Sequence, residues 1–117
     1  MEKKRYFGGC DIGSTTGKAV ILDESGTVAA SVIIPSEIDP EETSRIVMEK
    51  ACSMVKGLTG NGDLTYLVGT GYGRNEVPFA NENISEMSCH AMGVFACDPA
   101  IKTIVDIGGQ DLKGISV

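Results

Sequence analysis

The fold is decided by the stretch YFGGCDIGSTTGKAVIL, which occupies residues 6–22. Residues 6–12 are mostly apolar and predict a buried strand that ends in a polar carboxylate, Asp11. Residues 13–17 are Gly, Ser, Thr, Thr and Gly and predict a short loop, and residues 18–22 predict a second strand. Two strands joined by so short a loop are expected to pair as an antiparallel hairpin.

Working outward from this hairpin, the chain continues with a turn and a third strand. Residues 23–26 are Asp, Glu, Ser and Gly, a turn composition in which Gly26 supplies the positive φ. Residues 27–34 are rich in β-branched side chains and predict a third strand. The three strands therefore predict an antiparallel meander.

A helix is expected after the meander. Asp39 can cap its start, Pro40 suits the first helical position, and Glu42 can close a capping box. Lys56 and Gly57 are expected to end it. Between these signals, apolar residues recur at three- and four-residue steps and form a stripe: Val47, Met48, Ala51, Met54, Val55 and Leu58.

The rest of the chain alternates between strands and helices. The expected elements are a strand at 64–68, a short strand near 83–84, a helix from its cap Ser85 to about residue 96, and strands at 103–107 and 112–117. Asp98 and Pro99 stop the second helix. The predicted order is βββ-α-β-(β)-α-ββ, an α/β fold with a mixed sheet.

One internal repeat carries the chemistry. The runs Asp11-Ile12-Gly13 and Asp106-Ile107-Gly108 each close an apolar strand, and a small polar loop follows each of them. In both copies a lysine, Lys18 or Lys113, stands seven residues after the aspartate. Two hairpins with the same signature indicate two lobes of one duplicated fold.

Such paired hairpins suit a nucleoside triphosphate. Glycine-rich tips expose backbone N–H groups to phosphate oxygens, and the hydroxyls at residues 14–16 add donors. A carboxylate beside a triphosphate is repulsive without a cation, so Asp11 and Asp106 imply Mg²⁺ held through water, while Lys18 can neutralise phosphate charge. The alternative is that Asp-Ile-Gly occurs twice by chance at ordinary hairpins. The matched strand context and matched lysines favour the phosphate site.

The length and composition of the chain argue against several classes of protein. The chain has 117 residues, which is enough for one modest domain, and a formal net charge of −6. This acidity and the 5% aromatic content argue against nucleic acid as a partner. No stretch approaches the roughly 20 apolar residues that a membrane span needs, so no membrane partner is expected. The four cysteines show neither CxxC nor zinc spacing, which predicts free thiols in a reduced, cytoplasmic protein.

Three further stretches carry a resemblance: residues 69–75 (GTGYGRN), 85–93 (SEMSCHAMG) and 105–113 (VDIGGQDLK). With the paired hairpins, they resemble the superfamily of actin, sugar kinases, acetate kinase and heat-shock chaperones, whose lobes are ribonuclease-H-like. Within it, the chain from Phe7 on is similar to the BadF/BadG/BcrA/BcrD-type ATPases. It looks closest to the activator component of 2-hydroxyacyl-CoA dehydratases such as 2-hydroxyglutaryl-CoA dehydratase.

The resemblance implies an activator that hydrolyses ATP to ADP and drives an electron from a [4Fe-4S] cluster into the dehydratase. It also implies a homodimer that holds the cluster between its subunits. Asp11 and Asp106 would then be the metal-binding residues, and Glu86 and Gln110 compete for the place beside the attacking water. The implied nucleotide-binding residues are Gly13, Ser14, Thr15, Thr16 and Lys18 in the first loop, and Gly108, Gly109, Gln110, Asp111 and Lys113 in the second.

The chain departs from the family at its cysteines. The family's cluster cysteines lie downstream of the second phosphate loop, and none of Cys10, Cys52, Cys89 and Cys97 matches them. We therefore expect the N-terminal part of a longer activator. Residues 1–100 would form an N-terminal ATPase lobe and residues 101–117 the first hairpin of a second lobe. Such a chain should bind nucleotide weakly and lack the cluster.

Three alternatives stay open. The chain can belong to a sugar or acyl kinase of the same superfamily, or it can be a non-catalytic, nucleotide-dependent assembly lobe, as in actin. Benzoyl-CoA reductase subunits share these loops as well, and the sequence does not separate them from activators.

The remaining residues favour structural roles. Cys89 and His90 are adjacent on a helix and point about 100° apart, so they are not expected to share a ligand. Cys10 and Cys52 are expected to be buried small hydrophobes. Gly93 inside a helix costs about 1 kcal/mol against alanine, which predicts close packing there. Residues 69–75 are expected to form a structural turn rather than a nucleotide-sensing switch.

Overall fold

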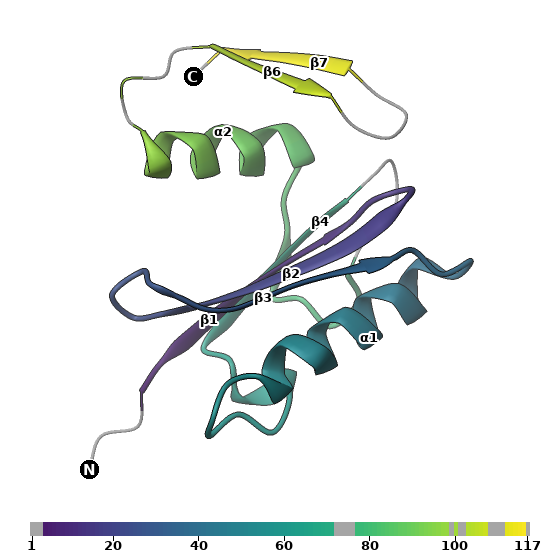
Figure 1. Cartoon of the computed structure of the whole chain (residues 1–117), viewed down its shortest axis with the longest axis vertical. Coiled ribbons are helices and arrows are strands. Elements are labelled where there is room, and N and C mark those ends of the chain that lie inside the picture. The colour runs from purple at the N-terminus through teal and green to yellow at the C-terminus, as the bar shows by residue number, and fades with distance from the viewer. Residues whose placement is uncertain (1–3, 72–76, 99, 101–102, 108–111, 117) are drawn as a thin grey trace.

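The computed structural model describes residues 4–71, 77–98, 100, 103–107 and 112–116, and only the backbone of the last two ranges. Figure 1 shows helix α1 (Pro40–Ser53) against one face of a five-stranded sheet and helix α2 (Glu86–Cys97) on the opposite side. A two-stranded ribbon of β6 (Thr103–Ile107) and β7 (Leu112–Ser116) lies beyond α2. The predicted order of strands and helices is confirmed, with one short 3₁₀ turn, η1 (Asn61–Asp63), added before the fourth strand.

The sheet is built on the predicted meander. β1 (Tyr6–Ile12) pairs antiparallel with β2 (Thr16–Asp23), and β2 pairs antiparallel with β3 (Val28–Pro35). On the other side of β1, β4 (Tyr66–Gly71) is parallel to β1, and β5 (Glu82–Asn83) is parallel to β4. The strand order β3-β2-β1-β4-β5 makes β1 the central strand, so side chains near its end have neighbours on both sides.

The loop between β1 and β2 is tighter than predicted. The Gly13 N–H donates to the Thr16 carbonyl at 2.9 Å, so β2 begins at Thr16 instead of residue 18. β4 is also shifted, to Tyr66–Gly71 from the predicted 64–68, because its ladder with β1 extends to Gly71. Long-range pairing sets this second boundary, and local composition does not report it.

Helix α1 covers one face of the sheet and closes the core. Asp39 caps it as predicted, its carboxylate accepting from the Glu41 N–H at 3.0 Å. The predicted capping box does not form, because Glu42 pairs with Arg45. The buried core combines alternate residues of the strands with the inner face of the helix: Cys10, Ile12, Ala19, Ile21, Ala30, Ile34, Val47, Met48, Ala51, Cys52, Val55, Leu64, Leu67 and Val77.

The end of α1 differs from the prediction. The helix ends at Ser53, and the N–H groups of Met54, Val55 and Leu58 donate to carbonyls three residues earlier. This tightening turns Met54 outward, where it is 58% exposed, so its predicted place in the apolar stripe is wrong. Gly57 has a φ of +97°, but it lies three residues after the C-cap Met54, so the prediction that Lys56 and Gly57 end the helix is wrong.

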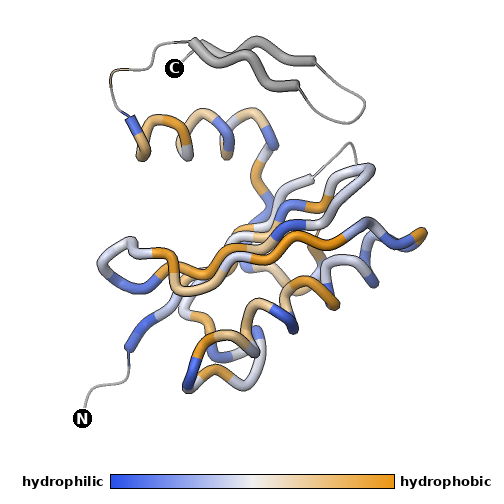
Figure 2. The backbone as a smooth tube through the Cα atoms, viewed as in Figure 1, coloured by the Kyte–Doolittle hydropathy of each residue, from blue (hydrophilic) through white to orange (hydrophobic). Residues whose placement is uncertain are grey.

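Helix α2 starts as predicted but packs more loosely than α1. The Ser85 side chain accepts from the Ser88 N–H at 3.2 Å and caps the helix. None of its residues is fully buried, and the tube in Figure 2 mixes apolar and polar colours along it. A Cβ built at Gly93 would meet none of the described atoms within 4 Å, so the predicted close packing against the sheet is wrong, and packing against the other lobe stays a prediction.

The β6–β7 ribbon repeats the register of β1–β2. Asp106 lies opposite Lys113, as Asp11 lies opposite Lys18. The Asp-Ile parts of the two signatures therefore have the same backbone pairing. Among the described residues, no helix is long and apolar enough to cross a membrane.

Candidate functional site

Three cross-strand neighbours form a polar row near the carboxyl end of β1. Asp11 lies opposite Lys18 of β2 on one side and opposite Thr70 of β4 on the other. Cys10 and Ile12, on either side of Asp11, point into the core beneath α1. Side chains alternate along a strand, so Asp11 points to the other face, toward α2. The predicted hairpin is confirmed, and its observed register places Asp11 and Lys18 together in this row.

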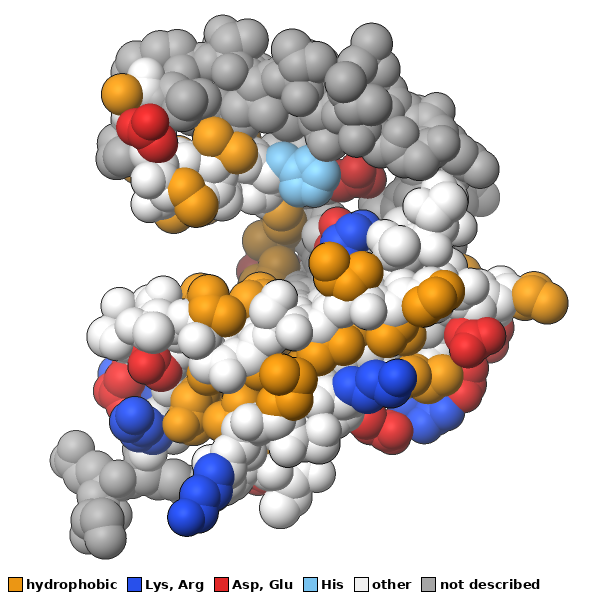
Figure 3. All heavy atoms as spheres, in the orientation of Figure 1, with side chains coloured by type: hydrophobic (Ala, Val, Ile, Leu, Met, Phe, Trp, Pro, Cys, Tyr) orange, Lys and Arg blue, Asp and Glu red, His pale blue; other side chains and the backbone are white. Residues whose placement is uncertain are grey.

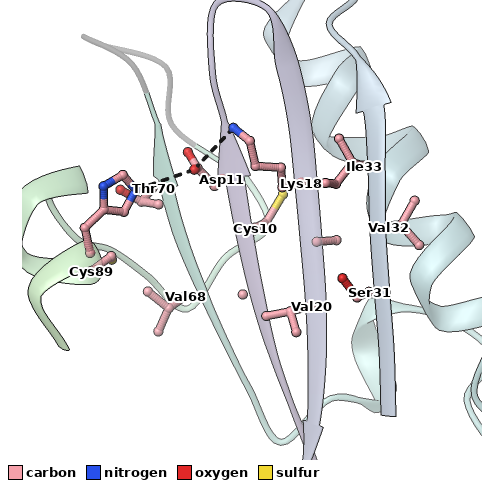
Figure 4. A pocket seen from close by; sticks show the side chains of 13 residues that line it. Cys10, Asp11, Lys18, Val20, Ser31, Val32, Ile33, Val68, Thr70 and Cys89 are labelled. Carbon is pink, nitrogen blue, oxygen red and sulfur yellow. Dashed lines mark ion pairs between the residues drawn. The ribbon is translucent and has the colours of Figure 1, made fainter. Parts of the chain in front are cut away.

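The row borders a cavity of about 360 Å³ between the sheet and α2. Most of the wall is apolar and includes Val20, Val32, Ile33 and Val68, as Figure 4 shows. Figure 3 shows the molecule hollowed on this side, with hydrophobic side chains above and below the opening. A cavity of this size with a few convergent polar groups has the general form of a ligand site.

One carboxylate is flanked by two basic side chains in this cavity. Lys18 Nζ lies 3.5 Å from Asp11 Oδ2, and His90 Nε2 of α2 lies 4.0 Å from the same oxygen (Figure 4). The side chains of Asp11, His90 and Lys18 are 24%, 32% and 43% exposed, so the group is accessible to a ligand from the cavity. Partly exposed pairs of this kind contribute only about 0–1 kcal/mol to the stability of the fold.

The turn after β1 is fixed by the end of β3. Ser36 Oγ donates to the Gly13 carbonyl and the Ser36 N–H donates to the Thr15 carbonyl, both at 2.9 Å. A Cβ at Gly13 would lie 3.1 Å from the Thr16 carbonyl oxygen and 3.4 Å from Lys18 Nζ. The Gly13 N–H is used within the turn, so donors for a phosphate group at this tip must come from Ser14 and Thr15.

The Thr70 hydroxyl is buried beside Asp11, with no partner among the described residues. Thr70 is 8% exposed, and its Oγ1 makes no hydrogen bond with any of the described residues. Leaving a buried hydroxyl unpaired costs about 1–3 kcal/mol, so such atoms are rare outside functional sites. Thr70 therefore belongs to the candidate site.

Thr70 and His90 were not predicted as site residues. Residues 69–75 were expected to form a structural turn, yet residues 69–71 belong to β4, whose carboxyl end is beside that of β1. The signal that would have found Thr70 is the parallel pairing of these two strands, because ligands gather at the carboxyl ends of parallel strands. His90 was expected to be structural, and its approach to Asp11 depends on the placement of α2.

Glu86 lies at the start of α2, one helical turn before His90 and on the same side of the helix. It is half-buried and does not line the cavity. Of the predicted second loop, Asp106 and Lys113 are described by their backbone pairing alone. The predicted positions Gly108, Gly109, Gln110 and Asp111 lie outside the described residues.

The chemistry of the polar row fits a hydrated Mg²⁺ ion and a phosphate chain. Mg²⁺ usually keeps several waters and takes one or two carboxylates, which Asp11 can supply. Lys18 and the turn at Ser14 and Thr15 supply positive charge and donors for phosphate oxygens.

The described residues of one chain do not form an iron–sulfur site by themselves. No group of three or more His, Cys, Asp or Glu side chains in the described part of the chain could hold a metal ion. Cys10 and Cys52 are buried as predicted, and burial, followed by the charge of Asp11, raises the pKa of the Cys10 thiol to about 12. A thiol must lose its proton to bind iron, so burial keeps Cys10 in the wrong state for this role.

Comparisons with known proteins agree with this geometry. A family model described as the BadF/BadG/BcrA/BcrD ATPase family matches residues 9–117. The activator of lactoyl-CoA dehydratase from Anaerotignum propionicum is 41% identical over 110 residues, which are 94% of this chain and 41% of that protein. The (R)-2-hydroxyglutaryl-CoA dehydratase activating ATPase of Acidaminococcus fermentans is 34% identical over 113 residues, which are 96% of this chain and 42% of that protein.

A solved structure has the same fold. The activator of the 2-hydroxyisocaproyl-CoA dehydratase from Clostridium difficile, determined with bound ADPNP, superimposes with a TM-score of 0.84 at 42% identity. The match covers 96% of this chain and 41% of that one. The chain thus spans about two fifths of the length of these relatives.

Proposed function

This chain belongs to the BadF/BadG/BcrA/BcrD ATPase family, and we propose that it is the phosphate-binding lobe of an ATPase that activates a 2-hydroxyacyl-CoA dehydratase. Its fold is the ribonuclease-H-like lobe predicted from the resemblance. The activity of a whole activator is part of the proposal, because this chain spans about two fifths of its relatives.

The observation that carries the proposal is the polar row beside the turn at residues 13–16. Asp11, Lys18 and Thr70 come from three adjacent strands and converge on one cavity, with a turn whose tip is held by Ser36. A carboxylate, an ammonium and turn N–H groups in this arrangement are the groups that a metal–phosphate ligand needs.

Each residue has a distinct part in binding. Asp11 would bind the cation through its water, Lys18 would neutralise a phosphate oxygen, and the tip at Ser14 and Thr15 would donate hydrogen bonds. A magnesium ion bound there would supply charge neutralisation for the triphosphate. Gln110 and Glu86 stay competing candidates for orienting the attacking water.

The partner in this proposal is a 2-hydroxyacyl-CoA dehydratase, since relatives at 41% and 34% identity are named for activating such enzymes. The proposed role includes electron transfer from a [4Fe-4S] cluster in a homodimer. The resemblance implies cluster cysteines downstream of the second phosphate loop, and no group of three metal ligands forms among the described residues, so the ligands would come from residues outside this chain. All four thiols are unpaired, which supports the proposed cytoplasmic location.

Binding of Mg²⁺ and ADPNP to the 117-residue chain, measured by isothermal titration calorimetry, tests the proposal. We expect weak but measurable binding that Asp11→Asn weakens about tenfold, equivalent to about 1.4 kcal/mol. The effect of Asp11→Asn should shrink when EDTA removes Mg²⁺, because the carboxylate acts through the cation.

The matched control is Glu37→Gln, which removes one negative charge from an exposed position away from the cavity. Its affinity for Mg²⁺ and ADPNP should equal that of the unmodified chain. Equal affinities of the Asp11→Asn and Glu37→Gln variants, or no nucleotide binding by the unmodified chain, would contradict the proposed function.

A further inference from the structure

The Thr70 hydroxyl is the polar group of the cavity that no role yet explains. Thr70 is 8% exposed, and its Oγ1 is without a hydrogen-bond partner among the residues that the structure describes. Folding removes such a hydroxyl from water, and in native proteins a buried hydroxyl almost always has another hydrogen-bond partner. Because Thr70 lines the cavity, a ligand in the cavity is the partner within reach.

Packing alone does not account for a threonine at this position. Valine has nearly the same shape as threonine and no polar atom to leave unpaired. If this residue only filled space between β4 and α2, valine would therefore give a more stable folded chain than threonine does. The Thr70 hydroxyl therefore lowers the stability of the folded chain, and a ligand that hydrogen-bonds to it would offset this loss.

The position of Thr70 identifies what it can bind. Thr70 and Asp11 are opposite each other in the parallel pair of β1 and β4, and both line the cavity. Adjacent strands lie about 4.8 Å apart, so one ligand oxygen can contact both side chains. The contacts of Lys18 and His90 with Asp11 are both made to Oδ2. Asp11 Oδ1 and Thr70 Oγ1 are the oxygens that remain for a shared ligand within the described site.

The hydrogen-bonding capacity of these two oxygens limits the class of ligand that can bind to both of them. A carboxylate only accepts hydrogen bonds, whereas a threonine hydroxyl donates one and accepts others. A water molecule satisfies both oxygens by donating to the carboxylate and bonding to the hydroxyl. A phosphate oxygen satisfies the hydroxyl as its acceptor. Both belong to a hydrated metal–phosphate group, which is the ligand class of the proposed function.

We propose that Thr70 is a nucleotide-binding residue, whose hydroxyl hydrogen-bonds the hydrated metal–phosphate group beside Asp11. This inference rests on the proposed function and deepens it, because it assigns a contact from β4 to a site otherwise built from the β1–β2 hairpin. It also explains why an unpaired hydroxyl is retained inside the fold.

The test compares Thr70→Val with Thr70→Ser in the 117-residue chain. Calorimetry with Mg²⁺ and ADPNP should show about tenfold weaker binding for Thr70→Val and binding within about twofold of the unmodified chain for Thr70→Ser. Without nucleotide, Thr70→Val should melt at the same temperature as the unmodified chain or higher, because valine removes the unpaired hydroxyl.

Thr65→Val is the matched control, since Thr65 is exposed and lies just before β4. It should bind Mg²⁺ and ADPNP as the unmodified chain does. A repeat in EDTA distinguishes the two partners of the hydroxyl. Loss of affinity in Thr70→Val with and without Mg²⁺ assigns a phosphate oxygen, and loss only with Mg²⁺ assigns a cation-bound water.

Three results would overturn the inference. If the unmodified chain binds ADPNP and Thr70→Val binds equally well, the Thr70 contact is wrong while the proposed function stands. If Thr70→Val melts well below the unmodified chain and Thr70→Ser loses affinity equally, the side chain is structural. Failure of the unmodified chain to bind any nucleotide would instead reject the proposed function and the inference together.

Discussion

Among the described residues, the ammonium group of Lys18 pairs with Asp11 alone, and Lys18 lines the cavity. Its Nζ lies 3.5 Å from Asp11 Oδ2, and the side chain remains 43% exposed. Such a pair adds about 0–1 kcal/mol to the stability of the fold. The charge of Lys18 can therefore contribute more to an anionic ligand than to folding.

Substitution of Lys18 by methionine separates these two contributions. We expect Lys18→Met to weaken the affinity for ADPNP about tenfold, since a compact positive charge next to phosphate is lost. The free energy of unfolding should change by less than about 1 kcal/mol. Calorimetry and urea unfolding measure the two quantities. Lys56→Met, at an exposed position after α1, is the control, and a large loss of stability with unchanged affinity would refute the assignment.

Sequence could predict Asp11 and Lys18 but not Thr70. The first two residues are joined by one short turn, so the sequence itself specifies that they face each other across a hairpin. Thr70 reaches Asp11 through a parallel pairing that spans an intervening helix, and no local pattern specifies that register. His90 depends in addition on how α2 lies over the sheet.

At the scale of elements, the two glycines Gly17 and Gly93 have opposite surroundings. A Cβ at Gly17 of β2 would collide with Thr43 Cγ2 of α1, whereas a Cβ at Gly93 of α2 would meet none of the described atoms within 4 Å. Gly17 lets α1 approach the sheet closely. Gly93 has no comparable packing role among the described residues. It therefore lowers the helix propensity of α2 without a compensating contact among them.

Alanine substitutions test this contrast. Gly17→Ala should lower the free energy of unfolding by about 1–3 kcal/mol, because α1 must move away from the sheet. Gly93→Ala should raise it by about 0.5–1 kcal/mol through helix propensity. Chemical denaturation of both variants gives the two values. Destabilisation by Gly93→Ala would mean that α2 packs more closely than the structure describes.

The sequence predicted an element boundary correctly where a few adjacent residues specify it, and less well elsewhere. The caps Asp39 and Ser85 and the turn at Gly26 were correctly predicted, because each is specified by a few adjacent residues. The end of α1 was predicted too late, since the apolar spacing of Met54 continues past the point where the backbone tightens. Periodicity reports which face a residue would occupy if the helix continued, and not where it stops.

For the molecule as a whole, the side of the sheet facing α2 is less covered than the side facing α1. Ile33 of β3 is 68% exposed, and Met92 and Phe95 of α2 are 68% and 46% exposed. Large exposed apolar side chains of this kind mark surfaces that make further contacts. The relatives, of which this chain matches about two fifths, have additional length to provide such contacts.

The distribution of the cysteines over the molecule leads to a prediction about iron. Cys10 lies in the central strand and Cys52 in α1, both buried, while Cys89 and Cys97 are on α2 on the other side of the sheet. A cubane cluster needs thiolates that converge on one point.

We expect that anaerobic reconstitution of the 117-residue chain with iron and sulfide leaves far less than one cluster per dimer, by iron analysis and visible absorption. A variant with all four cysteines replaced by serine should retain the same residual iron, because that iron is not bound by thiolates. Stoichiometric iron that disappears in the serine variant would show that these cysteines are cluster ligands and would overturn the assignment of the cluster to residues outside this chain.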